Sequence, residues 1–406
     1  GDPETVSYGG TTVQTRFTDV CCADGMIYAL DLQRGRLFWY DPEGRLLGAF
    51  GGLGAQTGTF ETPAAVDTQG EQLLVLDAGK GGIVRFAPTD YGRLLKKADK
   101  KLVAGRYAEA KEDWAQLLRL DNRSQLALIG MGKALAEEGD SEGALRCFEK
   151  GQDRASYAEA FKALRDERLK QSLPFLAVGL AVLCAALWLW RRKLSAPRFR
   201  RLSRLRFTLC HPIKGFTQCC EERTASAGIG LLIACIGFAA LVVKRQFTGF
   251  SFNEEDPLGI NILFLLAQSV LLLIGWSAAN WSVTTLLDGK GRFKQIFYIS
   301  AVSAVPYIAA LYLYTLMSNC FVPSEGLFMT AVLLIGGLWS FALLWCGLSV
   351  VHEYSFSKTL GSILLTVLAL LIVLFILVLF FSLMQQTLQF VLDIYNELSF
   401  RQITTG

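Results

Sequence analysis

The sequence predicts a multidomain membrane protein with an all-β part, an α-helical repeat part, and an all-α polytopic membrane part with six transmembrane helices. Three observations predict this fold class. Apolar residues make up 52% of the chain and charged residues only 19%, and the long apolar runs all follow residue 172. Before that point, a pattern of short strands repeats after 45 to 46 residues, and a helical pattern then repeats after 34 residues.

The strand pattern occupies residues 1–90. The segment "CCADGMIYALDLQRGRLFWYDPEGRLLGAFGG" aligns with "AVDTQGEQLLVLDAGKGGIVRFAP". Equivalent positions are Gly25 and Gly70, Asp31 and Asp77, and Tyr40 and Phe86. Repeats of this period built from short strands are typical of β-propeller blades, with glycines in the connections that need a positive φ. We interpret the recurring aspartates Asp31, Asp67 and Asp77 as turn residues and not as catalytic acids.

A glycine-rich segment, "FGGLGAQTGTFETPAAVD" (50–67), raises the question of phosphate binding. A phosphate loop needs a lysine and a hydroxyl residue at the start of a helix, but Gly58 is followed by Thr59, Phe60 and Glu61. The segment instead resembles the NHL repeat family. The matching residues are Phe50, Gly51, Gly54, Gly58, Phe60, Pro63, Val66 and Asp67. Because about two blades are present and propellers usually need four or more, the sequence either begins partway through a propeller or leaves part of it out.

Residues 91–172 carry the helical repeat. Small and aromatic residues recur at a spacing of 34, in the pairs Gly105 and Gly139, Ala110 and Ala144, and Trp114 and Phe148. This period resembles that of tetratricopeptide repeats, whose helix pairs pack through such residues. The resemblance implies a concave face that binds other proteins. The alternative is a helical spacer that holds the propeller away from the membrane.

Six apolar runs predict transmembrane helices, because each is near or above the roughly 18 residues that cross a hydrocarbon core. They are 173–190, 226–243, 258–279, 296–317, 327–350 and 359–384. A soluble protein would need many helices that are apolar on every face. After the last run, residues 385–406 continue with apolar residues at helical spacing, which predicts an amphipathic extension.

Basic residues predict the orientation. A cluster without acidic residues follows the first run: Arg191, Arg192, Lys193, Arg198, Arg200, Arg201, Arg204 and Arg206. Because cytoplasmic flanks are enriched in lysine and arginine, we expect 191–225 to lie inside the cell and 1–172 and the C-terminus outside. A basic cluster beside a membrane span favours contact with anionic lipid headgroups over nucleic acid.

The membrane part resembles the Yip1 family. Two segments carry the resemblance, "CHPIKGFTQCCEERTASAGIGLL" (210–232) and "NWSVTTLLDGKGRFKQIFYISAVSAVPY" (280–307). The matching residues are Pro212, Phe216, Gly289, Lys290, Gly291, Phe293, Lys294, Gln295 and Pro306. The tyrosine usual in that family before the proline is replaced here by Ala304 and Val305. The resemblance implies a five-helix domain over 226–384 that starts on the cytoplasmic side and ends on the far side.

Candidate catalytic and metal-binding residues are few. The sequence has two histidines, His211 and His352, and nothing in it indicates a catalytic triad, which needs a base held by a third group. Cys210, Cys219 and Cys220 lie near His211, but their spacing fits no zinc pattern. We therefore predict no enzymatic activity, metal or cofactor.

Ionisable residues, which usually mark a transport path, occur only at the edges of the apolar runs. Asn280 beside Trp281 is interpreted as an interfacial anchor. Two function classes remain. The first, which we favour, is a scaffold protein that docks other membrane proteins. The second is a transporter or lipid-handling protein with an external capture domain. The combination of blades, helical repeats and a Yip1-like domain resembles envelope proteins of Gram-positive bacteria. That resemblance implies an accessory subunit of a carbohydrate importer of the ATP-binding-cassette type, with permeases and a solute-binding protein as partners.

Overall fold

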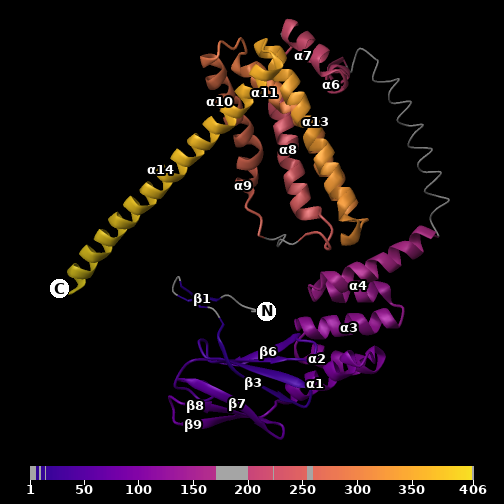
Figure 1. The fold of residues 1–406 in the computed structure, drawn as a ribbon, viewed down its shortest axis with the longest axis vertical. Coiled ribbons are helices and arrows are strands. Elements are labelled where there is room, and N and C mark those ends of the chain that lie inside the picture. Colours follow the sequence, from indigo (N-terminus) through magenta and orange to yellow (C-terminus); the bar gives the residue numbers. More distant parts are fainter. Residues whose placement is uncertain are drawn as a thin grey trace. The chain divides into compact units, whose positions relative to one another are not determined.

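The computed structural model describes residues 6–8, 11–13, 15–170, 200–222, 224–253 and 259–404. The chain forms two compact units, Gly1–Glu167 and Arg168–Gly406 (Figure 1). The first predicted transmembrane run, 173–190, lies outside the described residues, as do Arg191, Arg192, Lys193 and Arg198.

Antiparallel sheets open the first unit. Strands β1 (Val6–Tyr8) and β2 (Thr11–Val13) pair with each other. A four-stranded sheet follows in chain order, made of β3 (Phe17–Ala23), β4 (Met26–Asp31), β5 (Arg36–Tyr40) and β6 (Leu46–Gly51). A three-stranded sheet contains β7 (Pro63–Gln69), β8 (Gln72–Asp77) and β9 (Gly82–Phe86). The two larger sheets share a core of Leu30, Leu37, Phe60, Val66, Leu73 and Val75.

The two larger sheets repeat one arrangement. Strands β3, β4 and β5 begin 46 residues before β7, β8 and β9. Asp31 and Asp77 are both fully buried, and their Oδ1 atoms accept backbone N–H groups at equivalent positions. The donors are Arg16 and Gln33 for Asp31, and Thr62 and Gly79 for Asp77, at 2.8 to 3.1 Å. These contacts confirm the turn interpretation for Asp31 and Asp77. It is wrong for Asp67, which lies within strand β7 and pairs with Leu74 of β8. The assignment to an NHL-type propeller stays a prediction.

The glycine-rich segment uses its polar groups internally. The Gly54 N–H donates to the Phe60 carbonyl, and the Phe60 N–H donates to the Gly52 carbonyl, each at 2.8 Å. The ammonium group of Lys80 donates to the carbonyl of Thr59 at 2.8 Å, and the Phe60 ring is fully buried. The segment therefore packs between the two larger sheets through Phe60.

The helical part begins where the sequence predicts it, after β9. It contains α1 (Asp90–Val103), α2 (Tyr107–Leu120), α3 (Gln125–Glu137) and α4 (Ser141–Lys150), followed by a helix over 154–170. The ring of Trp114 lies against Gly130, and the ring of Phe148 lies against Gly132, so closely that a side chain at either glycine would overlap the ring. The residues spaced by 34 share burial and backbone conformation: Ala110 and Ala144 are fully buried, as nearly are Trp114 and Phe148, and Gly105 and Gly139 both have a positive φ. The tetratricopeptide assignment stays a prediction.

The described residues of the second unit contain five helices that are long and apolar enough to span a membrane. The first is α8 (Ala227–Phe247). The second comprises α9 (Ile262–Leu266), a π-helical turn η2 (Ala267–Leu271) and α10 (Leu272–Leu286). The third comprises α11 (Phe293–Ser303) and α12 (Val305–Ser318). A 3-10 turn η3 (Pro323–Glu325) leads into the fourth helix, α13 (Gly326–His352), and the fifth is α14 (Phe356–Thr404). The last five predicted spans are therefore confirmed as apolar helices, and this is a multi-pass membrane protein.

One helix lies largely free of the others. Helix α14 contacts α10 and α13 near its start, where Thr359, Ser362 and Thr366 are buried. Beyond that region it extends away from the other helices (Figure 1), and the side chains from 371 to 394 are all exposed. The predicted extension 385–406 continues the same helix to Thr404.

The interfacial interpretation of Asn280 is wrong. Its side chain is fully buried, and its Nδ2 donates to Oγ1 of Thr366 at 2.9 Å. This hydrogen bond joins α10 to α14 within the helix unit. Between helices in a membrane, such a side chain acts as a polar tie, because lipid offers it no hydrogen-bond partner.

Candidate functional site

Two short helices, α6 (Arg200–Cys210) and α7 (Pro212–Glu221), lie at one end of the membrane helices (Figure 1). Pro212 stands in the first turn of α7, where its missing N–H costs nothing. Gly215 lets the two helices approach, because a Cβ there would lie 2.5 Å from Cα of Thr208. The two helices thus form a tight hairpin.

Phe216 fixes this hairpin to the spans. Its side chain is fully buried and belongs to a core with Ile296, Ile299 and Leu348. The ring lies close to Gly347 of α13, where an added Cβ would be 3.2 Å from it. Pro212 and Phe216, which the sequence singled out, therefore shape and attach one element.

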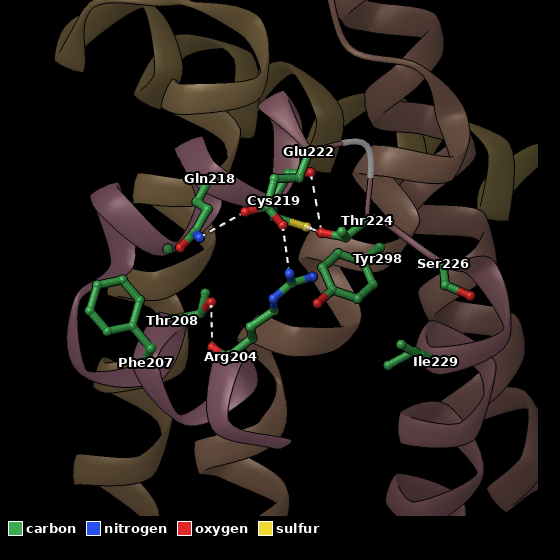
Figure 2. A pocket seen from close by; sticks show the side chains of 11 residues that line it. Arg204, Phe207, Thr208, Gln218, Cys219, Glu222, Thr224, Ser226, Ile229 and Tyr298 are labelled. Carbon is green, nitrogen blue, oxygen red and sulfur yellow. Dashed lines mark hydrogen bonds and ion pairs between the residues drawn. The ribbon is translucent and has the colours of Figure 1, made fainter. Parts of the chain in front are cut away.

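A cavity of about 290 Å³ lies between the hairpin, the first turn of α8 and Tyr298 in the second turn of α11 (Figure 2). Figure 2 shows the guanidinium of Arg204 facing Glu222, with Nη2 2.8 Å from the carboxylate. Gln218 donates to the same carboxylate at 2.9 Å. The charge of Arg204, predicted to contact lipid headgroups, is thus balanced across the cavity, whereas the Arg206 side chain is exposed.

The cysteines near this cavity are held by packing and hydrogen bonds. The Thr224 hydroxyl donates to Sγ of Cys219 at 3.3 Å. Burial raises the pKa of the Cys220 thiol to about 11, while Cys210 and His211 are exposed. Among the described residues, no group of three or more His, Cys, Asp or Glu side chains could hold a metal ion.

The Gly289–Lys290–Gly291 segment closes the same end of the unit by packing on His352. The Gly291 N–H donates to Nδ1 of His352 at 3.3 Å. A Cβ on Gly289 would lie 2.6 Å from Nδ1, and one on Gly291 would lie 2.6 Å from Cε1. Both glycines are therefore required by the imidazole, which is only 2% exposed.

Polar contacts on either side reinforce this packing. Lys290 forms an ion pair with Glu353 at 2.5 Å, and Glu353 ends α13 in a left-handed conformation with φ of 56°. The Tyr354 hydroxyl donates to the Leu287 carbonyl at 2.9 Å. Burial, with a smaller effect from the charge of Asp288, raises the pKa of Tyr354. The loops 287–292 and 353–355 are thus held together as one clasp.

The remaining predicted motif residues belong to the helix that follows the clasp. Gln295 Oε1 accepts the Arg292 N–H at 3.0 Å and caps α11. Phe293 stacks on Phe297 with ring centroids 6.2 Å apart, and the Lys294 side chain is exposed.

Pro306 lies in the first turn of α12, at the break after Ser303. The next N–H, that of Tyr307, donates to Oγ of Ser340 on α13 at 3.0 Å. The proline therefore marks the bend between α11 and α12.

These motif residues coincide with a known domain. Residues 206–380 match the Yip1 domain. Comparison with curated proteins finds no match to this chain. The Yip1 domain begins within α6 and ends within α14, so it includes the hairpin, the clasp and the five spans. The resemblance seen in the sequence is therefore confirmed for the C-terminal region.

Sequence reasoning missed the partners of the Yip1 motif residues. His352, Glu353 and Tyr354 meet the glycine segment from more than 60 positions away. The sequence signal for these three residues was that they form a polar triplet between two apolar runs. Glu222 was also missed, although an acid opposite a basic cluster is a common ion-pair partner.

Proposed function

We propose that this chain is a non-catalytic membrane protein that docks other membrane proteins through its Yip1 domain. The uncovered surface of α14 carries this proposal. Phe375 is 63% exposed and Val378 is 65% exposed. A helix that the rest of the unit leaves uncovered offers a face to helices of another protein, with close packing as the driving force.

The character of the spans supports docking over ion-coupled transport. In the described spans, the charged side chains stand at the ends, as with Lys244 and Lys294. Proton and ion pathways through membranes usually carry ionisable side chains in the interior. The buried polar groups instead tie helices together, as Asn280 does with Thr366.

A finer form of the proposal follows from the family resemblances of the sequence. The chain would be an accessory subunit of a carbohydrate importer of the ATP-binding-cassette type in a bacterial plasma membrane. The first unit, with its sheets and helices, would lie outside the cell and contact a solute-binding protein. The basic residues after the first span would contact anionic lipid headgroups on the cytoplasmic side.

Affinity purification of the full chain in mild detergent, followed by mass spectrometry, tests this function. Permease and ATPase subunits should be recovered together. The double variant Phe375→Ala with Val378→Ala, which trims one face of α14, should lose them. The matched control is Leu334→Ala with Leu338→Ala on α13, where both side chains are 62% exposed; it should retain the partners.

Deleting residues 1–172 distinguishes docking to the permease from contact with a solute-binding protein. The shortened chain should keep the permease and lose any solute-binding protein. If the full chain purifies alone and moves ions or lipids in liposomes, the docking function is wrong and the transporter class takes its place.

A further inference from the structure

A cavity of about 470 Å³ lies among the spans, bounded by α8, the η2–α10 segment, α11, α12 and Leu344 of α13. It extends from the interior of the helix unit to its side. Ala234 and Ala301 in its wall are 4% and 0% exposed, whereas Leu272 and Tyr307 are 47% and 42% exposed. The cavity therefore opens sideways, at a depth where the surroundings of the protein are lipid chains.

Hydrocarbon is the natural occupant of such a space. An apolar cavity of about 150 Å³ stays dry and accepts benzene, and this cavity is about three times larger. Its size also falls in the range of roughly 300 to 1,000 Å³ that is typical of ligand pockets. Water would find few partners along a wall made mainly of aliphatic side chains.

Two buried polar groups in the wall lack a hydrogen-bond partner among the described residues, Nε1 of Trp276 and Oγ of Ser300. Ser269 donates its hydroxyl to the carbonyl of Leu265, one turn earlier. Ser300, which lines the cavity and is 4% exposed, has no hydrogen-bond partner for Oγ among the described residues. A buried unsatisfied hydroxyl is costly. A carbonyl group of a ligand would remove that cost.

The π-helical turn Ala267–Leu271 contributes to the same wall through Gln268 and Ser269. Such turns widen a helix locally and occur often at functional sites. Ser300 stands about 10 Å along α11 from its first residue, since each residue adds 1.5 Å. Leu311 lies farther along the same span, so the cavity runs deeper into the membrane from Ser300.

We propose that this cavity binds one acyl chain of a membrane glycerolipid, whose ester carbonyl accepts a hydrogen bond from Ser300. The chain then runs past Ala304 and Ile308 toward Leu311. This site is independent of docking through α14. It is the place in the fold where the second function class, a lipid-handling protein, would bind its lipid.

Photo-crosslinking tests the site. The full chain is placed in nanodiscs of phosphatidylcholine that contain a phosphatidylcholine with a diazirine at the end of one acyl chain. After irradiation, mass spectrometry should find label on 305–318 of α12 above the level on 371–384 of α14. Because α14 is the more exposed helix, labelling that simply follows exposure would overturn the proposal.

Two variants on one helix sharpen the test. Ala234→Leu fills the cavity, whereas Ala239→Leu adds the same side chain at an exposed position of α8. The first should reduce labelling of α12 by about tenfold, the loss expected for displacing one or two buried methylene groups. The second should leave it unchanged.

A third variant does not depend on tolerance of a larger side chain. Ser300→Ala keeps the space and removes the hydroxyl, and should reduce labelling about two- to tenfold, the range expected for one hydrogen bond. Size-exclusion profiles check that each variant is folded. Wild-type labelling in folded Ser300→Ala and unchanged labelling in Ala234→Leu would both contradict the proposal.

Discussion

The backbone N–H of Gly291 donates to Nδ1 of His352, so that a two-glycine segment and the last residue of a membrane helix form one contact. Gly291→Ala would place a Cβ 2.6 Å from the imidazole. We expect it to destabilise the membrane unit by about 1 to 3 kcal/mol, as overpacking usually does. A thermal melt in detergent measures this. Gly361→Ala, at a site with open space, is the control and should melt no lower than wild type.

The buried hydrogen bond between Asn280 and Thr366 should contribute measurably to the packing of α10 on α14. Asn280→Ala and Thr366→Val each remove one partner, and each should lower stability. Hydrogen bonds between membrane helices average about 0.6 kcal/mol and reach about 2 kcal/mol. A double-mutant cycle should give a coupling energy in that range. Strictly additive losses would show that the two side chains do not interact.

Asp99 should make the first unit more stable in mild acid. The side chain is 2% exposed. Burial raises its pKa to about 6, although Arg45 opposes the shift. Because the folded state holds the proton more tightly than the unfolded state, stability falls as the pH rises from about 4 through 6.

Asp99→Asn should therefore slow hydrogen exchange over α1 and α2 at about pH 7. The free energy of opening that the exchange reports should rise by up to about 3 kcal/mol at that pH and change little at about pH 4. The control is Asp90→Asn in the same helix, since the Asp90 side chain is fully exposed. Equal changes in hydrogen exchange for the two variants, or a larger change for Asp99→Asn in acid, would contradict the raised pKa of Asp99.

Arg204 and Arg206 should differ in their contribution to binding anionic lipid. A basic residue near an anionic surface contributes about 1 kcal/mol. Arg206 is exposed, so Arg206→Gln should weaken binding to vesicles containing phosphatidylserine about fivefold. Arg204 is already paired with Glu222, so Arg204→Gln should have a smaller effect. Co-sedimentation with vesicles at two salt concentrations measures the binding of both variants. A larger loss of binding for Arg204→Gln than for Arg206→Gln would contradict this prediction.

Orientation can be measured directly. Single cysteines at Ser156 and Ser203, in a cysteine-depleted chain, are exposed to a membrane-impermeant thiol reagent on intact cells. The basic cluster predicts labelling at Ser156 and protection at Ser203. Permeabilised cells should label at both positions. Labelling at Ser203 alone in intact cells would reverse the predicted topology.

The local features of the fold could be predicted from the sequence. Turn chemistry identified Asp31 and Asp77 because part of their hydrogen bonding is local: each accepts an N–H group from two residues later, in addition to one from 15 residues earlier. The spacing of 34 identified Trp114 and Phe148 as buried positions. Length and apolar composition were enough for the five described spans.

The contacts of the candidate site could not be predicted, because they join residues that are far apart in the chain. Nothing near Gly291 indicates that His352 lies against it. The position of Asn280 in an apolar run was compatible with an interface and with a helix contact, and only the packing of α14 decides between them. The cavity beside Ser300 likewise depends on how the helices around it diverge.

The length of α14 has a consequence for how this protein responds to its surroundings. The helix has 49 residues, about 74 Å at 1.5 Å per residue, and it is fixed to its neighbours only near its start. Its uncharged stretch is longer than a hydrocarbon core of about 30 Å, and a helix accommodates such excess length by tilting. The angle of the free portion is then set by the thickness of the bilayer. A thicker membrane would bring α14 closer to upright and move its far end relative to the first turns that hold it.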